Sequence, residues 1–160
     1  MFRSLVRAKA FALGLATPKE SEERKLADLL RCAAVTALEK HKQEVEIYQI
    51  VELKENESWD EYILRISNPF EFAGEAELFV LNKELGTPIK IFMDSPKGRI
   101  CIQEYRGEKE PPLNLLFNTA GPPHYDPLLP KEYGPKNKTM MGRLRTAARR
   151  LFKQKKVNCW

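Results

Sequence analysis

The chain of 160 residues is long enough for one domain with an ordinary hydrophobic core. Its apolar content of 42% and charged content of 31% describe a soluble globular protein and exclude a disordered one. No apolar run approaches the roughly 18 to 20 residues of a membrane span. The three cysteines, Cys32, Cys101 and Cys159, lie far apart, which indicates a reducing compartment inside the cell, cytoplasmic or nuclear. With only two histidines beside them, we expect no metal centre and no cofactor.

The net charge of +5 is unevenly distributed. Residues 139–160 carry seven lysines and arginines and no acid, whereas the other 138 residues hold 20 basic and 22 acidic side chains, a net charge of −2. We therefore expect a near-neutral domain over residues 1–130 and a basic tail over residues 131–160. The tail predicts an amphipathic helix near 140–155 that binds anionic membrane, nucleic acid or an acidic partner. A helix folded back on the domain is the alternative. In either case the apolar stripe of the tail helix consists of Met141, Leu144, Ala148, Leu151 and Phe152.

Residues 1–19 are basic and contain no acid, and their apolar residues have a loosely helical spacing. This composition is typical of an organelle-targeting presequence. It also fits the first helix of a folded domain that packs Phe2, Leu5 and Val6 inward. Composition alone leaves both interpretations open.

Three amphipathic helices are predicted next, over residues 21–43, 58–67 and 75–84. Ser58 followed by Glu61 predicts a capping box at the start of the second of these helices. The segment between the first two, residues 45–56, is acidic and mixed, so we expect a loop or a frayed extension of the first helix. Cys32 is interpreted as a packed or rim residue. His41, among charges near a helix end, is interpreted as a solvated cap.

Strands follow the helices. Residues 89–93 and 99–105 alternate and flank a turn, which predicts a hairpin. Residues 113–117 form a further short apolar strand. Because Cys101 alternates with Ile100 and Ile102, it is expected to be structural. Helices first and a small sheet later predict an α+β fold in which helices flank the sheet.

A histidine and a carboxylate follow the last predicted strand. His124 and Asp126 are two residues apart, and Pro127 favours extended backbone for the residue before it. In an extended chain the two side chains point the same way. A carboxylate there can accept the imidazole N–H, fix the tautomer and raise the basicity of the ring. The other interpretation of His124 is a surface residue at a strand end.

Four stretches together resemble the ovarian-tumour (OTU) family of ubiquitin-directed cysteine proteases. Residues 2–5 are similar to the F-R-S start of the family's first helix, and residues 72–78 to its aromatic-G-G-x-x-E-L helix start, with Ala73 in place of one glycine. Residues 87–92 are similar to its P-I-x-V/I-aromatic strand, and 115–117 with 124–126 to its closing strand and H-Y-D/N motif. The resemblance covers residues 1 to about 129 and favours a folded first helix over a presequence.

The resemblance implies a papain-type cysteine protease fold and the hydrolysis of isopeptide bonds that follow ubiquitin or a ubiquitin-like protein. It implies that His124 is the general base and then the general acid, and that Asp126 orients it. The family places its nucleophile in a D-G-x-C loop one residue before the position of Met1. The expectation is therefore a truncated family member without the nucleophile and the oxyanion loop, inactive as 160 residues and monomeric. Gly121-Pro122-Pro123 departs from the family's short glycine-containing turn.

Two functional hypotheses of different classes remain. The chain is part of a longer cysteine-type deubiquitinase, or it is an inactive ubiquitin-binding or scaffold module that works through its basic tail.

Overall fold

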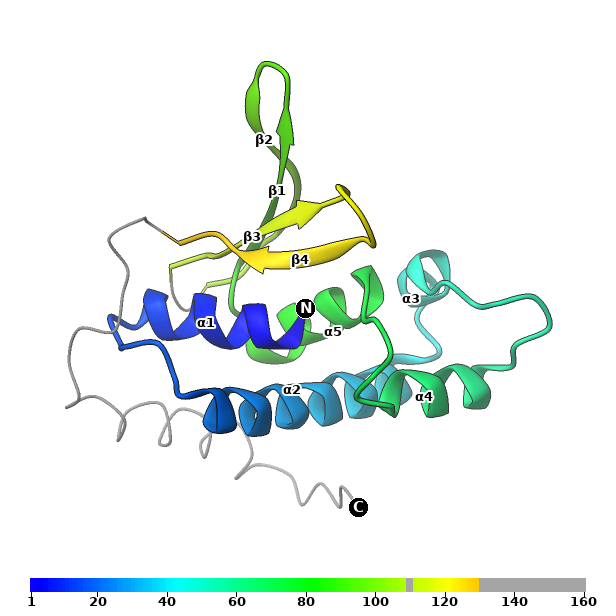
Figure 1. Cartoon of the computed structure of the whole chain (residues 1–160). Helices are drawn as coiled ribbons and strands as arrows, with labels where there is room; N and C mark the ends of the chain where they lie inside the picture. The colour runs from blue at the N-terminus through cyan, green and yellow to red at the C-terminus, as the bar shows by residue number, and fades with distance from the viewer. Residues whose placement is uncertain (109–110, 130–160) are drawn as a thin grey trace.

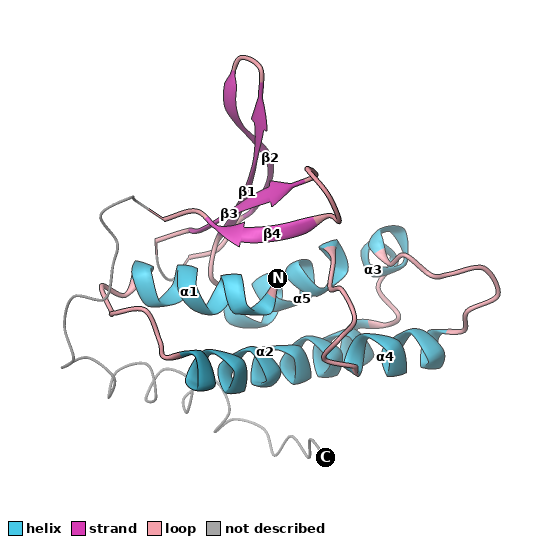
Figure 2. Ribbon diagram, in the orientation of Figure 1, coloured by secondary structure: helices cyan, strands magenta, loops and turns pink. Residues whose placement is uncertain are grey.

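The computed structural model describes residues 1–108 and 111–129, which form five helices and one four-stranded sheet (Figures 1 and 2). The predicted tail helix lies outside the described residues. None of the described helices is both long and apolar enough to span a membrane. In chain order the elements are α1 (Phe2–Ala12), α2 (Glu20–His41), α3 (Val45–Ile50), α4 (Trp59–Ser67), α5 (Glu75–Leu85), β1 (Ile89–Ser95), β2 (Gly98–Tyr105), β3 (Leu113–Asn118) and β4 (His124–Pro127).

The sheet has the strand order β2-β1-β3-β4. The β1–β2 and β3–β4 pairs are antiparallel, and the central β1–β3 pair is parallel. The hairpin and the three longer strands predicted from the sequence are confirmed. The order makes β4 an edge strand, so the residues on it remain accessible from one side.

The helices lie on one side of the sheet. In Figure 1, α1 and α5 lie next to the sheet, with α2 and α4 on the far side of them. The hydrophobic core fills the space between these layers, and alternate residues of β1 and β3 point into it. Core side chains that are at most 1% exposed include Leu38, Ile47, Leu78, Leu81, Ile89 and Leu115.

The first helix is an integral part of this core. Phe2, Leu5 and Val6 are each at most 4% exposed, which confirms the inward packing expected of a folded helix. A buried carboxylate of α2, Glu23, accepts hydrogen bonds from Arg3 and Arg7 of α1. Burial opposes the ionisation of Glu23, but the bonds from Arg7 and Arg3 outweigh it and hold its pKa below the usual value. This ion cluster fastens α1 to α2.

The capping box is confirmed, because Ser58 Oγ accepts from the Glu61 N–H while the Glu61 carboxylate accepts from the Ser58 N–H at 2.8 Å. Residues 45–56 differ from the prediction. They begin with a separate helix, α3, because α2 ends at His41 and the backbone of Glu44 is extended ahead of Val45. Burial of Ile47, which is 0% exposed, holds this short helix on the domain.

The prediction that Cys101 is structural is wrong. Every residue of β2 before Tyr105 is exposed, including Ile100 at 46% and Ile102 at 41%. The reason is position: β2 is an edge strand, and the β1–β2 hairpin projects away from the helices (Figure 1). Alternation along an edge hairpin therefore does not place either face in a core.

Candidate active site

His124 and Asp126 lie on one face of β4, as predicted for an extended chain. The distance from His124 Nε2 to Asp126 Oδ2 is 3.1 Å. Both side chains are partly exposed, at 41% and 48%. Cross-strand pairing with Asn118 and Leu116 of β3 fixes their register, so the pair stands on a regular strand and not on a free loop.

The other imidazole nitrogen is also occupied. His124 Nδ1 lies 2.9 Å from the carbonyl oxygen of Pro122. A carbonyl and a carboxylate can only accept, so both nitrogens carry a proton when both contacts are made. A general base needs one nitrogen without a proton. The Pro122 contact must therefore open before His124 can take a proton from a thiol.

The turn that leads into β4 determines this arrangement. Gly121 has a φ of +112°, a backbone conformation that residues other than glycine rarely adopt. The Asn118 side chain accepts from the Ala120 N–H at 2.9 Å and closes the first half of the turn. The turn thus brings the Pro122 carbonyl within hydrogen-bond distance of His124 Nδ1. The sequence indicated a departure from the family's pattern here, but not this contact.

The start of α1 lies beside β4. Ser4 Oγ donates to the carbonyl oxygen of Tyr125 at 2.5 Å. Burial lowers the pKa of the Met1 amino group, the charge of Arg31 lowers it further, and Asp126 acts in the opposite direction. The start of α1 and the strand that carries His124 and Asp126 therefore lie side by side at one edge of the sheet.

Tyr125 points to the opposite side of β4, toward the helices. Its ring packs on Phe117 with centroids 5.0 Å apart. Burial, followed by the negative charge of Glu75, raises the pKa of Tyr125 to about 12, so the phenol stays protonated. Glu75 also accepts a hydrogen bond from the Tyr105 hydroxyl at 3.2 Å. Sequence reasoning missed the cluster of Glu75, Tyr105 and Tyr125 because these three residues are 20 to 50 positions apart.

Neither described cysteine belongs to this site. Cys101 pairs with Phe92, Phe92 with Leu116, and Leu116 with Asp126. This row spans three strand spacings, so Cys101 is roughly 14 Å from Asp126. Cys32 is on α2, and α1 and α5 lie between α2 and the sheet in Figure 1.

The second histidine is also remote, and its interpretation as a solvated cap is wrong. His41 is 9% exposed. Its Nδ1 lies 2.7 Å from Glu44 and its Nε2 lies 2.8 Å from Glu84. Lys40 pairs with Glu84, and Lys83 with Glu44. The ring therefore joins α2, the start of α3 and α5 at the centre of an ion network.

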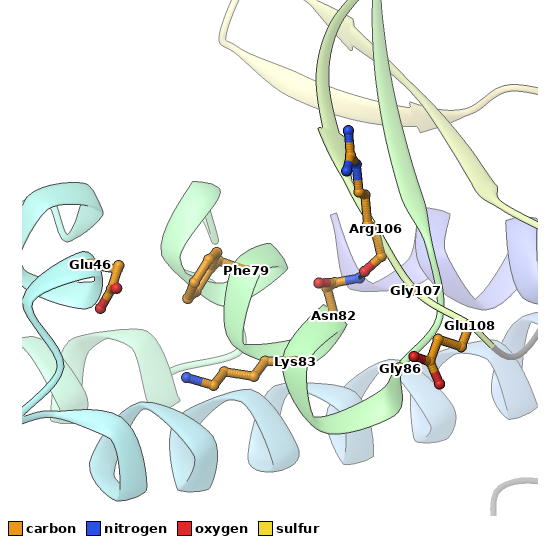
Figure 3. Close-up of a pocket in the computed structure, with 8 residues that line it drawn as sticks. All are labelled: Glu46, Phe79, Asn82, Lys83, Gly86, Arg106, Gly107 and Glu108. Carbon is orange, nitrogen blue, oxygen red and sulfur yellow. Dashed lines mark hydrogen bonds between the residues drawn. The ribbon is translucent and has the colours of Figure 1, made fainter.

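A hollow of about 450 Å³ lies between α3, α5 and the residues after β2 (Figure 3). It contains neither a histidine nor a cysteine, and no residue of α1 or β4 lines it. It is therefore separate from the His124 site. Within residues 1–108 and 111–129, no three histidine, cysteine or acidic side chains are grouped to hold a metal. The hollow is lined by Glu46, Phe79, Asn82, Lys83, Gly86, Arg106, Gly107 and Glu108.

Comparisons with known proteins give the same family as the resemblance seen in the sequence. A sequence model described as OTU-like cysteine protease matches residues 7–125. OVARIAN TUMOR DOMAIN-containing deubiquitinating enzyme 4 of Arabidopsis thaliana is 35% identical over 133 residues, which are 81% of this chain and 39% of that protein. OVARIAN TUMOR DOMAIN-containing deubiquitinating enzyme 3, also of Arabidopsis thaliana, is 33% identical over 119 residues, which are 68% of this chain and 50% of that protein. The chain thus spans half or less of the length of these relatives.

Solved structures show the same fold. The OTUD1 OTU domain superposes with a TM-score of 0.54 at 19% identity and covers 81% of this chain and 80% of its own. The Hazara virus OTU bound to ubiquitin gives 0.51 at 21% identity, with 80% of this chain and 75% of its own covered. The fold is therefore the α+β, papain-type fold of OTU domains, as expected from the sequence.

Proposed function

The chain belongs to the OTU-like cysteine protease family, and from that premise we propose that it carries the acid–base pair of a deubiquitinase active site. The proposed reaction is acyl transfer at an isopeptide bond after the C-terminus of ubiquitin. The observation that carries the proposal is the His124–Asp126 pair at 3.1 Å on the strand against which the start of α1 packs.

Each residue has one role in this reaction. After the Pro122 contact opens, His124 accepts the proton of a thiol as the sulfur attacks the carbonyl carbon. The same proton passes from His124 to the leaving amine when the C–N bond breaks. Water then releases the acyl group with His124 as base. Asp126 holds the ring in orientation throughout and stabilises the imidazolium.

We place the nucleophile immediately ahead of α1, where the family resemblance puts its cysteine. Two observations support that position. A thiolate is stabilised at a helix N-terminus, and the start of α1 packs on the strand that carries the pair. Cys101 is too far from Asp126, and Cys32 lies beyond the α1–α5 layer. In this proposal the 160-residue chain by itself is inactive.

Ubiquitin is the proposed partner. The viral relative in the comparisons was solved with ubiquitin bound, and the curated relatives are named as deubiquitinating enzymes. The runner-up function is a module that binds ubiquitin without cleaving it. The sequence upstream of Met1 separates the two, because an in-frame D-G-x-C segment supports the enzyme.

The test compares two forms of the protein with a thiol-reactive ubiquitin probe. The 160-residue chain should not react, because loss of the nucleophile alone costs on the order of 10⁶ in kcat. The same chain preceded by Asp-Gly-Arg-Cys and enough upstream residues to anchor that loop should react. In that extended form, His124→Ala should abolish turnover, and Lys97→Ala in the distant hairpin turn should not.

Two outcomes would contradict the proposal. Reaction of the unextended chain at Cys32, Cys101 or Cys159 would mean that the nucleophile is already present and has been misplaced. An extended protein that reacts equally well with and without His124 would remove the acid–base role.

A further inference from the structure

Arg31, in the middle of α2, makes an unusual set of contacts. Its guanidinium donates to the carbonyl oxygens of Ile66 at 2.7 Å, Glu71 at 2.9 Å and Pro69 at 3.3 Å. These carbonyls belong to the last turn of α4 and to the segment that leads to α5. Carbonyls at a helix C-terminus lack partners within the helix, so Arg31 satisfies groups that would otherwise need water.

The same guanidinium lies over the ring of Phe2. Its central carbon is 4.8 Å from the ring centroid, within cation–π range. Phe2 is the first residue of α1 and is 4% exposed. One side chain therefore connects α2, the α4–α5 segment and the start of α1.

The charge of Arg31 acts at the start of α1. Burial lowers the pKa of Arg31, but an arginine remains protonated at any physiological pH. The groups that face the Met1 amino group are Arg31 from α2, Arg3 from α1 and Asp126 from β4. Two of the three are cationic, and the α1 N-terminus adds the positive end of its dipole. Arg31 also faces the carboxylates of Glu77, Asp28 and Glu71. The charges of Arg31 and Arg3 favour an anion at this point, and that of Asp126 opposes it.

We propose that Arg31 is a positioning residue of this active site, which holds the start of α1 on α2 and the α4–α5 segment and favours an anion there. The inference rests on the proposed function only for the nature of that anion, the thiolate and then the oxyanion of acyl transfer. The His124–Asp126 motif does not include Arg31. It is 93 residues away in the sequence, and the fold brings it to the same helix end.

The Met1 amino group of the 160-residue chain reports on this charge without any thiol. Its pKa can be measured from the pH dependence of acylation, followed by mass spectrometry of the N-terminal peptide. In Arg31→Gln, and in Arg31→citrulline, the amine pKa should rise, because a neighbouring positive charge is lost. Citrulline keeps the shape of arginine but has an oxygen in place of one terminal nitrogen, so it removes the charge together with at least one of the hydrogen bonds to backbone carbonyls.

Two further variants separate charge from structure. Arg31→Lys retains the charge, so its amine pKa should stay close to that of the unmodified chain. Arg24→Gln is the matched control, because Arg24 lies two turns earlier on α2 and pairs with Glu20; the amine pKa should not change.

Each result bears on Arg31 alone. An unchanged amine pKa in the folded citrulline variant would overturn the proposal, and so would an equal rise in the citrulline and lysine variants. If Arg31→Gln does not fold, the citrulline variant decides. An extended protein that does not react with the ubiquitin probe refutes the proposed function instead, and leaves the amine result standing.

Discussion

The two histidines have matching contacts, with an oxygen acceptor at each ring nitrogen, yet only one belongs to the candidate site. His124 obtains its acceptors from Pro122 and Asp126, within two residues along the chain. His41 obtains Glu44 from the next turn and Glu84 from a helix 43 residues away. Local spacing predicted the His124–Asp126 contact but not the contact with Pro122. It could not predict the arrangement of His41, because Glu84 is provided by the tertiary fold.

Burial makes the His41 network important for stability. We expect His41→Ala to lower the free energy of unfolding by about 1–3 kcal/mol, because it removes a buried ring and its contacts with Glu44 and Glu84, which then keep only Lys83 and Lys40. Urea unfolding at pH 7 measures this change. Lys42→Ala, one residue later and exposed, is the control and should change stability by less than about 0.5 kcal/mol. Equal effects of the two variants would show that the network is unimportant.

Glu57 predicts a pH dependence. Its side chain is 9% exposed and pairs with Arg65 at 2.6 Å. The hydrogen bond from Arg65 is the main cause that lowers the Glu57 pKa from 4.5 to about 2. A lowered folded pKa means stability that is complete above about pH 4.5 and is lost as the pH falls toward 2.

The stability advantage of the unmodified chain over Glu57→Gln should therefore shrink between pH 5 and pH 3. Urea unfolding at several pH values measures it. Glu55→Gln, on the exposed loop two residues earlier, serves as the control and should show no such trend. A constant difference between the unmodified chain and Glu57→Gln across this range would contradict the assignment.

At the scale of elements, the sequence was informative where local signals determine structure. The capping box of Ser58 and Glu61, the β1–β2 hairpin and the strand at 113–118 all follow from short-range patterns. The predictions failed where contacts with other elements determine the structure. The helix α3 is too short to be stable alone and depends on burial of Ile47. The exposure of β2 depends on its place at the edge of the sheet, which a strand pattern does not contain.

A close backbone contact at the end of β2 provides a test of packing between elements. A β-carbon on Gly107 would lie 2.5 Å from the Gly86 carbonyl oxygen and 2.7 Å from the Pro88 nitrogen. Because both atoms belong to the backbone between α5 and β1, neither can rotate away. We expect Gly107→Ala to lower the free energy of unfolding by about 1–3 kcal/mol.

The matched control is Glu108→Ala, on the exposed neighbouring residue. In thermal and urea unfolding, the midpoint should be unchanged for Glu108→Ala and lower for Gly107→Ala. Because Gly107 lines the hollow of Figure 3 and not the His124 site, the proposed active site should keep its geometry in both variants.

At the scale of the molecule, the family resemblance supplied what periodicity could not. Spacing placed His124 and Asp126 on one face of a strand, but the link between that strand and the start of α1 spans the entire described chain. Four weak motifs in a fixed order predicted it, because their order implies the fold that joins them. The sequence contained no such signal for the contacts of Arg31. Its partners are backbone carbonyls, which every residue has, so residue types do not reveal them.

The charge division between body and tail predicts the behaviour of the full chain on anionic surfaces. Residues 139–160 hold seven basic side chains and no acid, and the remainder has a net charge of −2. Each basic residue near an anionic membrane contributes about 1 kcal/mol at moderate salt. We therefore expect the full chain to sediment with phosphatidylserine-containing vesicles, and a chain that lacks residues 139–160 not to do so.

The apolar residues of the tail distinguish a membrane from nucleic acid. Leu151→Asp with Phe152→Asp removes apolar side chains that would enter the bilayer interface, and it also adds two negative charges. Leu151→Ser with Phe152→Ser removes the same apolar groups at constant charge. Vesicle binding should therefore fall in both double variants, whereas RNA binding should persist in the serine variant. Arg149→Glu with Arg150→Glu should weaken both, and added salt should weaken RNA binding most steeply. Vesicle binding that survives deletion of residues 139–160 would show that the body, and not the tail, contacts the membrane.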